Sequence, residues 1–189
     1  SCLSCYGCMT TCPSGVNYMH LIDHGRNYIE ETYKRPLLDR LFRNILSWTL
    51  PKPNVFFVLM LALKFIKPFS FMMPKFLINT LNLMPDKIQS KKIKTQKIYP
   101  SASKKTVARV ALLTGCVQRI ISPEINESTI RLLNRHEVEV IVLQKIDCCG
   151  SLNHHLGKKE LALSSFVKNI KLWHEEYLNN GLDAIISNT

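Results

Sequence analysis

Glycine is scarce in this chain, with seven in 189 residues, and none of them forms the patterns that bind nucleotides. Neither G-x-G-x-x-G nor a P-loop sequence is present, so the chain holds no nucleotide or flavin site of those two types. Long hydrophobic runs are also missing. The longest, residues 55–63, has nine apolar residues, which is too short to span a bilayer. No signal peptide is visible.

Acidic residues are few as well: 14 Asp and Glu stand against 25 Lys and Arg, which gives a net charge of +11. Such a balance could attract nucleic acid, anionic lipid or an acidic partner protein. Much of it comes from residues 87–105, which hold seven lysines. This run has one aromatic residue, Tyr99, and no arginine. We therefore interpret it as a solvated linker, with no nucleic acid as a partner.

A run of four cysteines opens the chain, in the spacing C-x2-C-x2-C-x3-C followed by Pro13. This spacing is typical of bacterial-ferredoxin-type iron–sulfur proteins, in which the fourth cysteine ligates the other of two clusters. We predict that Cys2, Cys5 and Cys8 bind one [4Fe–4S] cluster and that Cys12 belongs to a second cluster. The sequence has no second copy of the run, so we expect a partner motif to lie upstream of a chain that is a fragment.

Both ends of the sequence support that expectation. The chain opens with Ser1, and residue 2 is already a candidate ligand. The last two residues follow an expected buried strand at 184–186, so we treat both ends as cut. The seven cysteines are an odd number in metal-type spacings, which favours a reducing cytoplasm over a disulfide framework.

Apolar residues recur at helical spacing in the first part of the chain. Helices are expected from residue 15 onward and over 37–49. Residues 54–84 should form short helices broken by prolines; their apolar surface could be a buried core or could lie against a membrane or a partner subunit, and we favour the core. We assign 1–84 to a helical, ferredoxin-type iron–sulfur domain with a truncated N-terminus, and 85–105 to the basic linker.

Strands alternate with helices after the linker. Short apolar runs at 107–113, 138–143 and 184–187 predict strands. Ser122 is expected to cap a helix that starts at Pro123, and a longer helix is expected over 157–178. This order implies parallel βαβ units, so the predicted fold class is α plus α/β, with a C-terminally truncated half-domain at 106–189.

Three further cysteines follow the first two of these strands. Cys116 comes after the first strand, and Cys148 and Cys149 come after the second. Because ligands gather at the carboxyl ends of parallel strands, we expect the three sulfurs to converge in one pocket lined by Gly115 and Gly150. Such a pocket suits an iron–sulfur cluster or zinc. Three buried structural thiols are the alternative, and no His/Asn arrangement points to a catalytic cysteine.

The residues around both cysteine groups resemble a known family. The segments 112–118 and 147–152, with Asn126, His155 and Gly157, resemble the first half of the cysteine-rich CCG domain. The segment 8–18, followed by Gly25-Arg26, resembles the same larger family, the iron–sulfur subunits of bacterial glycolate oxidase. In that family a further cysteine follows the third strand, which again implies truncation at the C-terminus. His155 would support the site by hydrogen bonding rather than by ligation.

The resemblance implies an electron-transfer subunit with two [4Fe–4S] clusters in the full-length protein and a further cluster or zinc at the CCG site. It would relay electrons from flavin-containing dehydrogenase subunits, which oxidise a 2-hydroxy acid, to a membrane acceptor. Its location would be the cytoplasm or the inner face of the cell membrane. No catalysis is expected from this chain alone. Similar modules in lactate utilisation, anaerobic glycerol-3-phosphate dehydrogenase and heterodisulfide reductase remain alternatives, as does a non-redox zinc-binding module.

Overall fold

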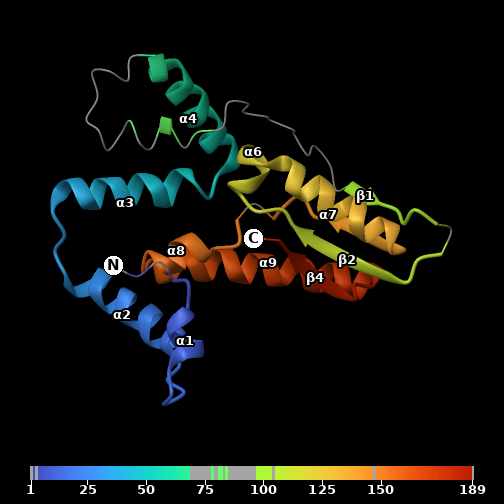
Figure 1. The fold of residues 1–189 in the computed structure, drawn as a ribbon, viewed down its shortest axis with the longest axis horizontal. Helices are drawn as coiled ribbons and strands as arrows, with labels where there is room; N and C mark the ends of the chain where they lie inside the picture. Colours follow the sequence, from blue (N-terminus) through green and yellow to red (C-terminus); the bar gives the residue numbers. More distant parts are fainter. Residues whose placement is uncertain are drawn as a thin grey trace. The chain divides into compact units, whose positions relative to one another are not determined.

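The computed structural model describes residues 2, 4–68, 78, 81–82, 84, 97–103, 105–146 and 148–188 (Figure 1). They form two compact units. One consists of residues 1–48 with 150–167, and the other of residues 49–149 with 168–189. The predicted boundaries at residues 84 and 105 do not coincide with this division, and they stay a prediction.

The first unit is helical. Its helices are α1 (Gly7–Thr11), α2 (Tyr18–Thr32), nearly all of α3 (Leu37–Thr49), α8 (Ser151–His155) and the first part of α9 (Lys159–Asn180). Asn17 caps α2, because its side-chain oxygen accepts a hydrogen bond from the backbone N–H of His20 at 3.4 Å. The helix expected from residue 15 therefore starts three residues later, where this cap allows it.

The second unit is built on a four-stranded mixed sheet with the order β1-β3-β2-β4. Its central strand β2 (Ala108–Leu113) pairs in parallel with β3 (Val138–Val142) and with β4 (Ala184–Ser187), as βαβ units require. β1 (Lys97–Tyr99) pairs antiparallel with β3. This edge strand lies in the segment that the sequence analysis assigned to the linker. The fold class is thus helical with a mixed sheet.

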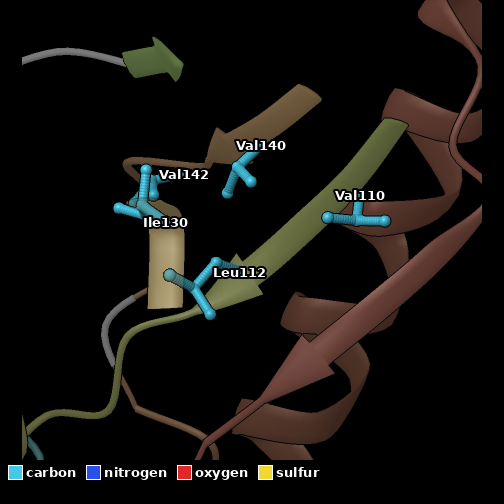
Figure 2. Packing of buried hydrophobic residues seen from close by; sticks show 5 residues of the cluster. All are labelled: Val110, Leu112, Ile130, Val140 and Val142. Carbon is cyan, nitrogen blue, oxygen red and sulfur yellow. The ribbon is translucent and has the colours of Figure 1, made fainter. Parts of the chain in front are cut away.

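The core of the sheet lies under α7 (Pro123–Arg135) and is shown in Figure 2. Val140 is fully buried, and Ile130 brings the helix onto the strands. Burying each such aliphatic side chain contributes about 1.5–3 kcal/mol, so this cluster is the main source of stability for the sheet. The buried members come from β2, β3 and α7: Val110, Leu112, Ile130, Val140 and Val142.

A second apolar cluster joins α4 (Pro53–Ile66) to α6 (Gln118–Ile121). Phe56 and Met60 of α4 pack with Ile120 of α6. One face of α4 is therefore buried, as we expected for the apolar segment, whereas Phe65 is 79% exposed. The expected helices beyond residue 68 lie almost entirely outside the described residues. Among the described residues, no single helix is long and apolar enough to cross a membrane; α3 and α4 meet that criterion only jointly, as a bent pair.

Local details differ from the sequence expectation at two places. Ser122 does precede α7, but it makes no side-chain cap; its N–H instead closes α6 by donating to Gln118 O. β4 was expected to be buried, yet Ile185 is 45% exposed, because β4 pairs on one side only. The chain also adopts a left-handed conformation between α7 and β3, at Glu137, with φ 62°.

Candidate functional site

The N-terminal cysteines lie on a tightly wound loop and on the short helix α1. Cys2, Cys5 and Cys8 are exposed. Ser4 and Tyr6, which alternate with them, have positive φ angles of 58° and 54°. A left-handed conformation costs a residue with a side chain about 1–2 kcal/mol, so this winding has to be held by other contacts. Exposed thiols on such a loop are accessible to a cluster placed outside the helices.

Cys12 has a different environment from the other three. It is half-buried, and the backbone N–H groups of Val16, Ser14 and Gly15 surround its sulfur. The Tyr18 hydroxyl is hydrogen-bonded to it at 3.9 Å. These donors, Val16 first, lower the pKa of the Cys12 thiol, because each stabilises the thiolate. The thiolate is the form that ligates metal, so Cys12 is prepared for ligation.

Arg26 of α2 holds the start of the cysteine loop. Its guanidinium donates to Cys2 O at 2.7 Å and to the Ser4 hydroxyl. The same guanidinium lies 4.0 Å from Asp23, whose carboxylate is 3.0 Å from His154 Nε2 and 3.5 Å from His155 Nδ1. Both histidines belong to α8, which directly follows the Cys-Cys-Gly sequence. Polar contacts thus connect the first cysteine loop to α8.

The second cysteine group lies at the carboxyl ends of β2 and β3. Cys116 accepts a hydrogen bond from the Cys148 thiol, so the fold brings these two predicted ligands together. This bond is the main reason that the pKa of Cys116 falls to about 7, and the backbone N–H groups of Val117 and Cys116 assist. Burial and the nearby charge of Cys149 act in the opposite direction. Cys116 is therefore partly ionised at neutral pH, where an ordinary thiol is not.

Three asparagines fix the backbone around this group. Asn126 donates to Thr114 O at 2.9 Å, just before Cys116, and Asn169 donates to Cys148 O at 2.9 Å. Asn188, which follows β4, donates to Asn126 Oδ1 at 3.1 Å. Asn126 and Asn169 are buried. The loops that carry the cysteines are thus held by buried side chains, which suits a preformed ligand site.

Gly150 and Gly157 border α8 where a side chain has no room. Gly150 has φ 90°, and a Cβ there would lie 2.7 Å from Phe166 Cε1. Gly157 has φ 77°, and a Cβ there would lie 2.6 Å from Arg26 O. We expected Gly150 to let the backbone approach a sulfur closely. In the structure, the missing Cβ of Gly150 leaves room for Phe166 of α9.

The thiol sets fit iron–sulfur chemistry by donor type. The N-terminal run supplies thiols only, with N–H donors around Cys12. At the second group, two thiols are in contact, and one of them ionises near pH 7. Within the ranges described above, no three His, Cys, Asp or Glu side chains already stand in a metal-binding arrangement. The ligand roles of all seven cysteines therefore remain predictions: Cys2, Cys5, Cys8, Cys12, Cys116, Cys148 and Cys149.

Asp23 and Asn169 were missed by the sequence analysis. Asn169 is a polar residue on a largely apolar side of α9, which it shares with Phe166 and Trp173, whereas the side of α2 that carries Asp23 is mostly polar. A polar side chain on an otherwise apolar stripe indicates a buried hydrogen bond. That signal could have identified Asn169, although not the carbonyl that it contacts, and no comparable signal marks Asp23.

Comparison with known proteins finds similarity to a cysteine-rich domain and to iron–sulfur subunits. Residues 110–189 match the profile of the CCG family, described as a cysteine-rich domain. The glycolate oxidase iron-sulfur subunit of Escherichia coli is 34% identical over 98% of this chain and 42% of its own length. The probable glycolate oxidase iron-sulfur subunit of Bacillus subtilis is 26% identical over 99% of this chain and 44% of its own length.

A shorter similarity involves an uncharacterized iron-sulfur protein of Methanococcus maripaludis, which is 36% identical over 67 residues, or 35% of this chain and 14% of its own length. No solved structure shows a significant match. The chain spans less than half the length of the curated glycolate oxidase subunits that it matches. The CCG profile matches the last 80 residues of the chain, which include Cys116, Cys148 and Cys149. Residues 110–189 are therefore similar to the CCG family of cysteine-rich domains.

Proposed function

We propose that this chain is part of the iron–sulfur subunit of a 2-hydroxy-acid oxidase of the glycolate oxidase type. It would relay electrons from a flavin-containing subunit toward a membrane acceptor. Two [4Fe–4S] clusters would be bound by the complete protein, with a further cluster or zinc at the CCG site. The location would be the cytoplasm or the inner face of the cell membrane.

One combination carries the proposal. The chain joins a C-x2-C-x2-C-x3-C-P run to a segment that matches the CCG profile. A glycolate oxidase iron-sulfur subunit aligns with 98% of this chain. The polar contacts of Arg26 and Asp23 support it further, because they tie the first cysteine loop to α8 within one compact unit. A ligand loop that is held in place suits an electron relay, in which a cluster must keep its position.

When bound, an iron–sulfur cluster accepts and releases single electrons at a potential set by hydrogen bonds to its sulfurs and by burial. The chain's own residues supply ligands and those hydrogen bonds. Cys2, Cys5 and Cys8 would ligate one cluster, while Cys12 would ligate the other with the N–H donors of Val16 and its neighbours around its sulfur. The bond that Arg26 makes to Cys2 O would keep the first ligand in place.

The test starts with the complete reading frame, purified anaerobically. About eight irons and eight acid-labile sulfides per protein are expected at the ferredoxin-type motifs, with more if the CCG site holds a cluster. Mixing with the flavin-containing subunit and glycolate should then reduce these clusters, as followed by electron paramagnetic resonance. The proposal fails if zinc is bound without labile sulfide, since this would indicate a non-redox zinc module.

The substrate is tested in the same assay. If lactate or glycerol 3-phosphate reduces the clusters and glycolate does not, the protein would instead be assigned to one of the related redox complexes. Fractionation of cells into soluble and membrane parts tests the proposed location. A protein recovered outside the cytoplasm and the cell membrane would contradict that part of the proposal.

A further inference from the structure

The thiols of Cys116 and Cys148 are in direct contact through the hydrogen bond between them. Their loops leave the parallel neighbours β2 and β3 at the same edge of the sheet. Neighbouring strands lie about 4.8 Å apart, and a disulfide joins α-carbons that are about 4.4–6.8 Å apart. Loops that start from adjacent strand ends therefore begin at a separation that suits a covalent bond between their sulfurs.

Cys149 is a poorer partner for either sulfur. It follows Cys148 directly, and adjacent α-carbons are about 3.8 Å apart, which is closer than a disulfide prefers. Its charge acts on Cys116, whereas the hydrogen bond to Cys116 comes from Cys148. Within the part of the chain that the structure describes, no three Cys, His, Asp or Glu side chains are arranged to hold a metal. The contact that the structure gives is a pair of thiols.

The two thiols differ in their access to solvent. Cys148 is buried, with 8% of its surface exposed, and Asn169 donates to its carbonyl at 2.9 Å. Cys116 is half-buried, and its loop is held by the hydrogen bond from Asn126 to Thr114 O. A molecule from solution therefore reaches Cys116 more easily than Cys148. Because both loops are held, the second sulfur stays beside the first while the first one reacts.

We propose that Cys116 and Cys148 form a thiol–disulfide exchange site for low-molecular-weight disulfides such as glutathione disulfide, active when the two sulfurs hold no metal. The Cys116 thiolate attacks one sulfur of glutathione disulfide, whose S–S bond breaks, and one glutathione leaves. The sulfur of Cys148 then attacks that of Cys116 and displaces the second glutathione. Two protein thiols are oxidised to one disulfide, one glutathione disulfide is reduced to two thiols, and the two protons pass to the departing glutathiones.

This disulfide and a bound metal exclude each other, because a metal needs the same two sulfurs as thiolates. Oxidation would thus close the candidate ligand site, and reduction would open it for loading. The inference goes beyond the proposed function, since it assigns a reaction to these thiols in the absence of metal. It does not involve the N-terminal cysteines, so it can fail or hold independently of the electron relay.

The test uses the complete protein, freed of metal with a chelator, reduced, and placed in mixtures of reduced and oxidised glutathione. Acid and iodoacetamide stop the exchange, and trypsin then cuts the chain. Cys116 leaves in the peptide 110–119, while Cys148 and Cys149 leave together in the peptide 146–158. Mass spectrometry should find these two peptides joined, and excess reduced glutathione should separate them. Protein unfolded in urea should give at least about tenfold less of the joined peptides at the same glutathione ratio, because the fold holds the thiols in contact.

Single variants assign the role of each sulfur. Cys149→Ala should keep the joined peptides and is the matched control. Cys148→Ala lacks the second sulfur, so it should hold one glutathione on Cys116 at a level at least about tenfold above that of the parent. Cys116→Ala should hold little glutathione on Cys148, since Cys148 is buried. Circular dichroism checks that all three variants fold.

Zinc tests the exclusion between metal and disulfide. Added to the reduced protein before glutathione, it should lower the amount of joined peptides at least about tenfold, and a chelator should restore them. Iron is measured separately on untreated protein. Joined peptides in a protein without iron would contradict the proposed function alone, whereas normal iron without joined peptides would contradict this inference alone.

Four outcomes overturn the inference. One is the absence of joined peptides at every glutathione ratio. Another is their persistence in Cys148→Ala, because Cys149 would then be the partner. The third is equal joining in folded and urea-unfolded protein, since the fold would then play no part. The fourth is joining that zinc leaves unchanged, because metal and disulfide would then not compete for the same sulfurs.

Discussion

The thiol of Cys148 donates a hydrogen bond to the sulfur of Cys116, and this bond joins the loop after β3 to the loop after β2. It exists because the two strands are parallel neighbours, so their carboxyl ends meet at one edge of the sheet. The pairing also sets the chemistry, since a thiolate stabilised by a second thiol is ready to ligate a soft metal.

The first prediction concerns the ionisation of Cys116 in metal-free protein. Alkylation of Cys116 should be half-maximal near the pKa of about 7. In Cys148→Ala the main donor to the thiolate is lost, so the pKa of Cys116 should rise toward its ordinary value of 9.0. Mass spectrometry of Cys116 after pulses of iodoacetamide across the pH range measures this change.

Cys149→Ala is the control for that experiment. The charge of Cys149 raises the pKa of Cys116, so its removal should lower that pKa or leave it in place. The shifted pKa of Cys116 also makes the stability of the fold depend on pH. The folded pKa lies below the unfolded one, so ionisation of Cys116 stabilises the fold at high pH and this contribution is lost as pH falls through about 7. A pKa of Cys116 that is the same in Cys148→Ala would contradict the hydrogen bond.

The sequence predicted this convergence because the strand rule depends only on apolar runs and their order. β2 and β3 were predicted from their short apolar runs, and the cysteines come soon after these runs in the sequence. β1 was missed for a physical reason: Lys97–Tyr99 is short and lies in a lysine-rich run, and it becomes a strand only through pairing with β3. Local propensity carries no information about that partner.

The orientation of α3 could not be predicted either. Helical spacing identifies which residues share a face, but it does not say which face turns toward the protein. That choice follows from contacts such as those of Arg43 and Ser47, which are distant in sequence from their partners in and after α8. Glu137 is a similar case, since its positive φ depends on how the chain leaves α7 to enter β3.

The second prediction separates Cys5 from Cys12. In the complete protein, Cys5→Ser should remove about four irons and the matching visible absorption, because Cys5 would ligate the first cluster. Cys12→Ser should instead perturb the other cluster. Electron paramagnetic resonance distinguishes the two signals, and Thr10→Ala, an exposed change in α1, should leave both in place. If Cys12→Ser abolishes the cluster of Cys5 and spares the other, the motif closes on itself and the assignment is wrong.

The third prediction concerns Tyr18, whose hydroxyl is hydrogen-bonded to Cys12. A donor to a ligand sulfur stabilises the more negative, reduced cluster. Tyr18→Phe should therefore lower the reduction potential of the cluster that Cys12 ligates, by on the order of tens of millivolts. Redox titration monitored by electron paramagnetic resonance gives the value. Tyr28→Phe, on the exposed side of α2, is the matched control, and an equal shift in both variants would contradict a specific role for Tyr18.

The last prediction concerns Asn169, which is 3% exposed and donates to Cys148 O at 2.9 Å. Asn169→Ala leaves that carbonyl without this donor in a buried place. The free energy of unfolding should fall by about 1–3 kcal/mol, the usual cost of an unsatisfied buried group. Urea unfolding of the metal-free protein measures it. Asn179→Ala, an exposed change on the same helix, should cost less than about 0.5 kcal/mol.

A second measurement tells a specific role of Asn169 from a general loss of packing. The carbonyl that it holds belongs to Cys148, so its loss should also loosen the thiol that supports the Cys116 thiolate. Alkylation of Cys116 in Asn169→Ala should shift to higher pH, in the same direction as in Cys148→Ala. If the variant is less stable but the pKa of Cys116 stays at about 7, Asn169 stabilises α9 without positioning the cysteines.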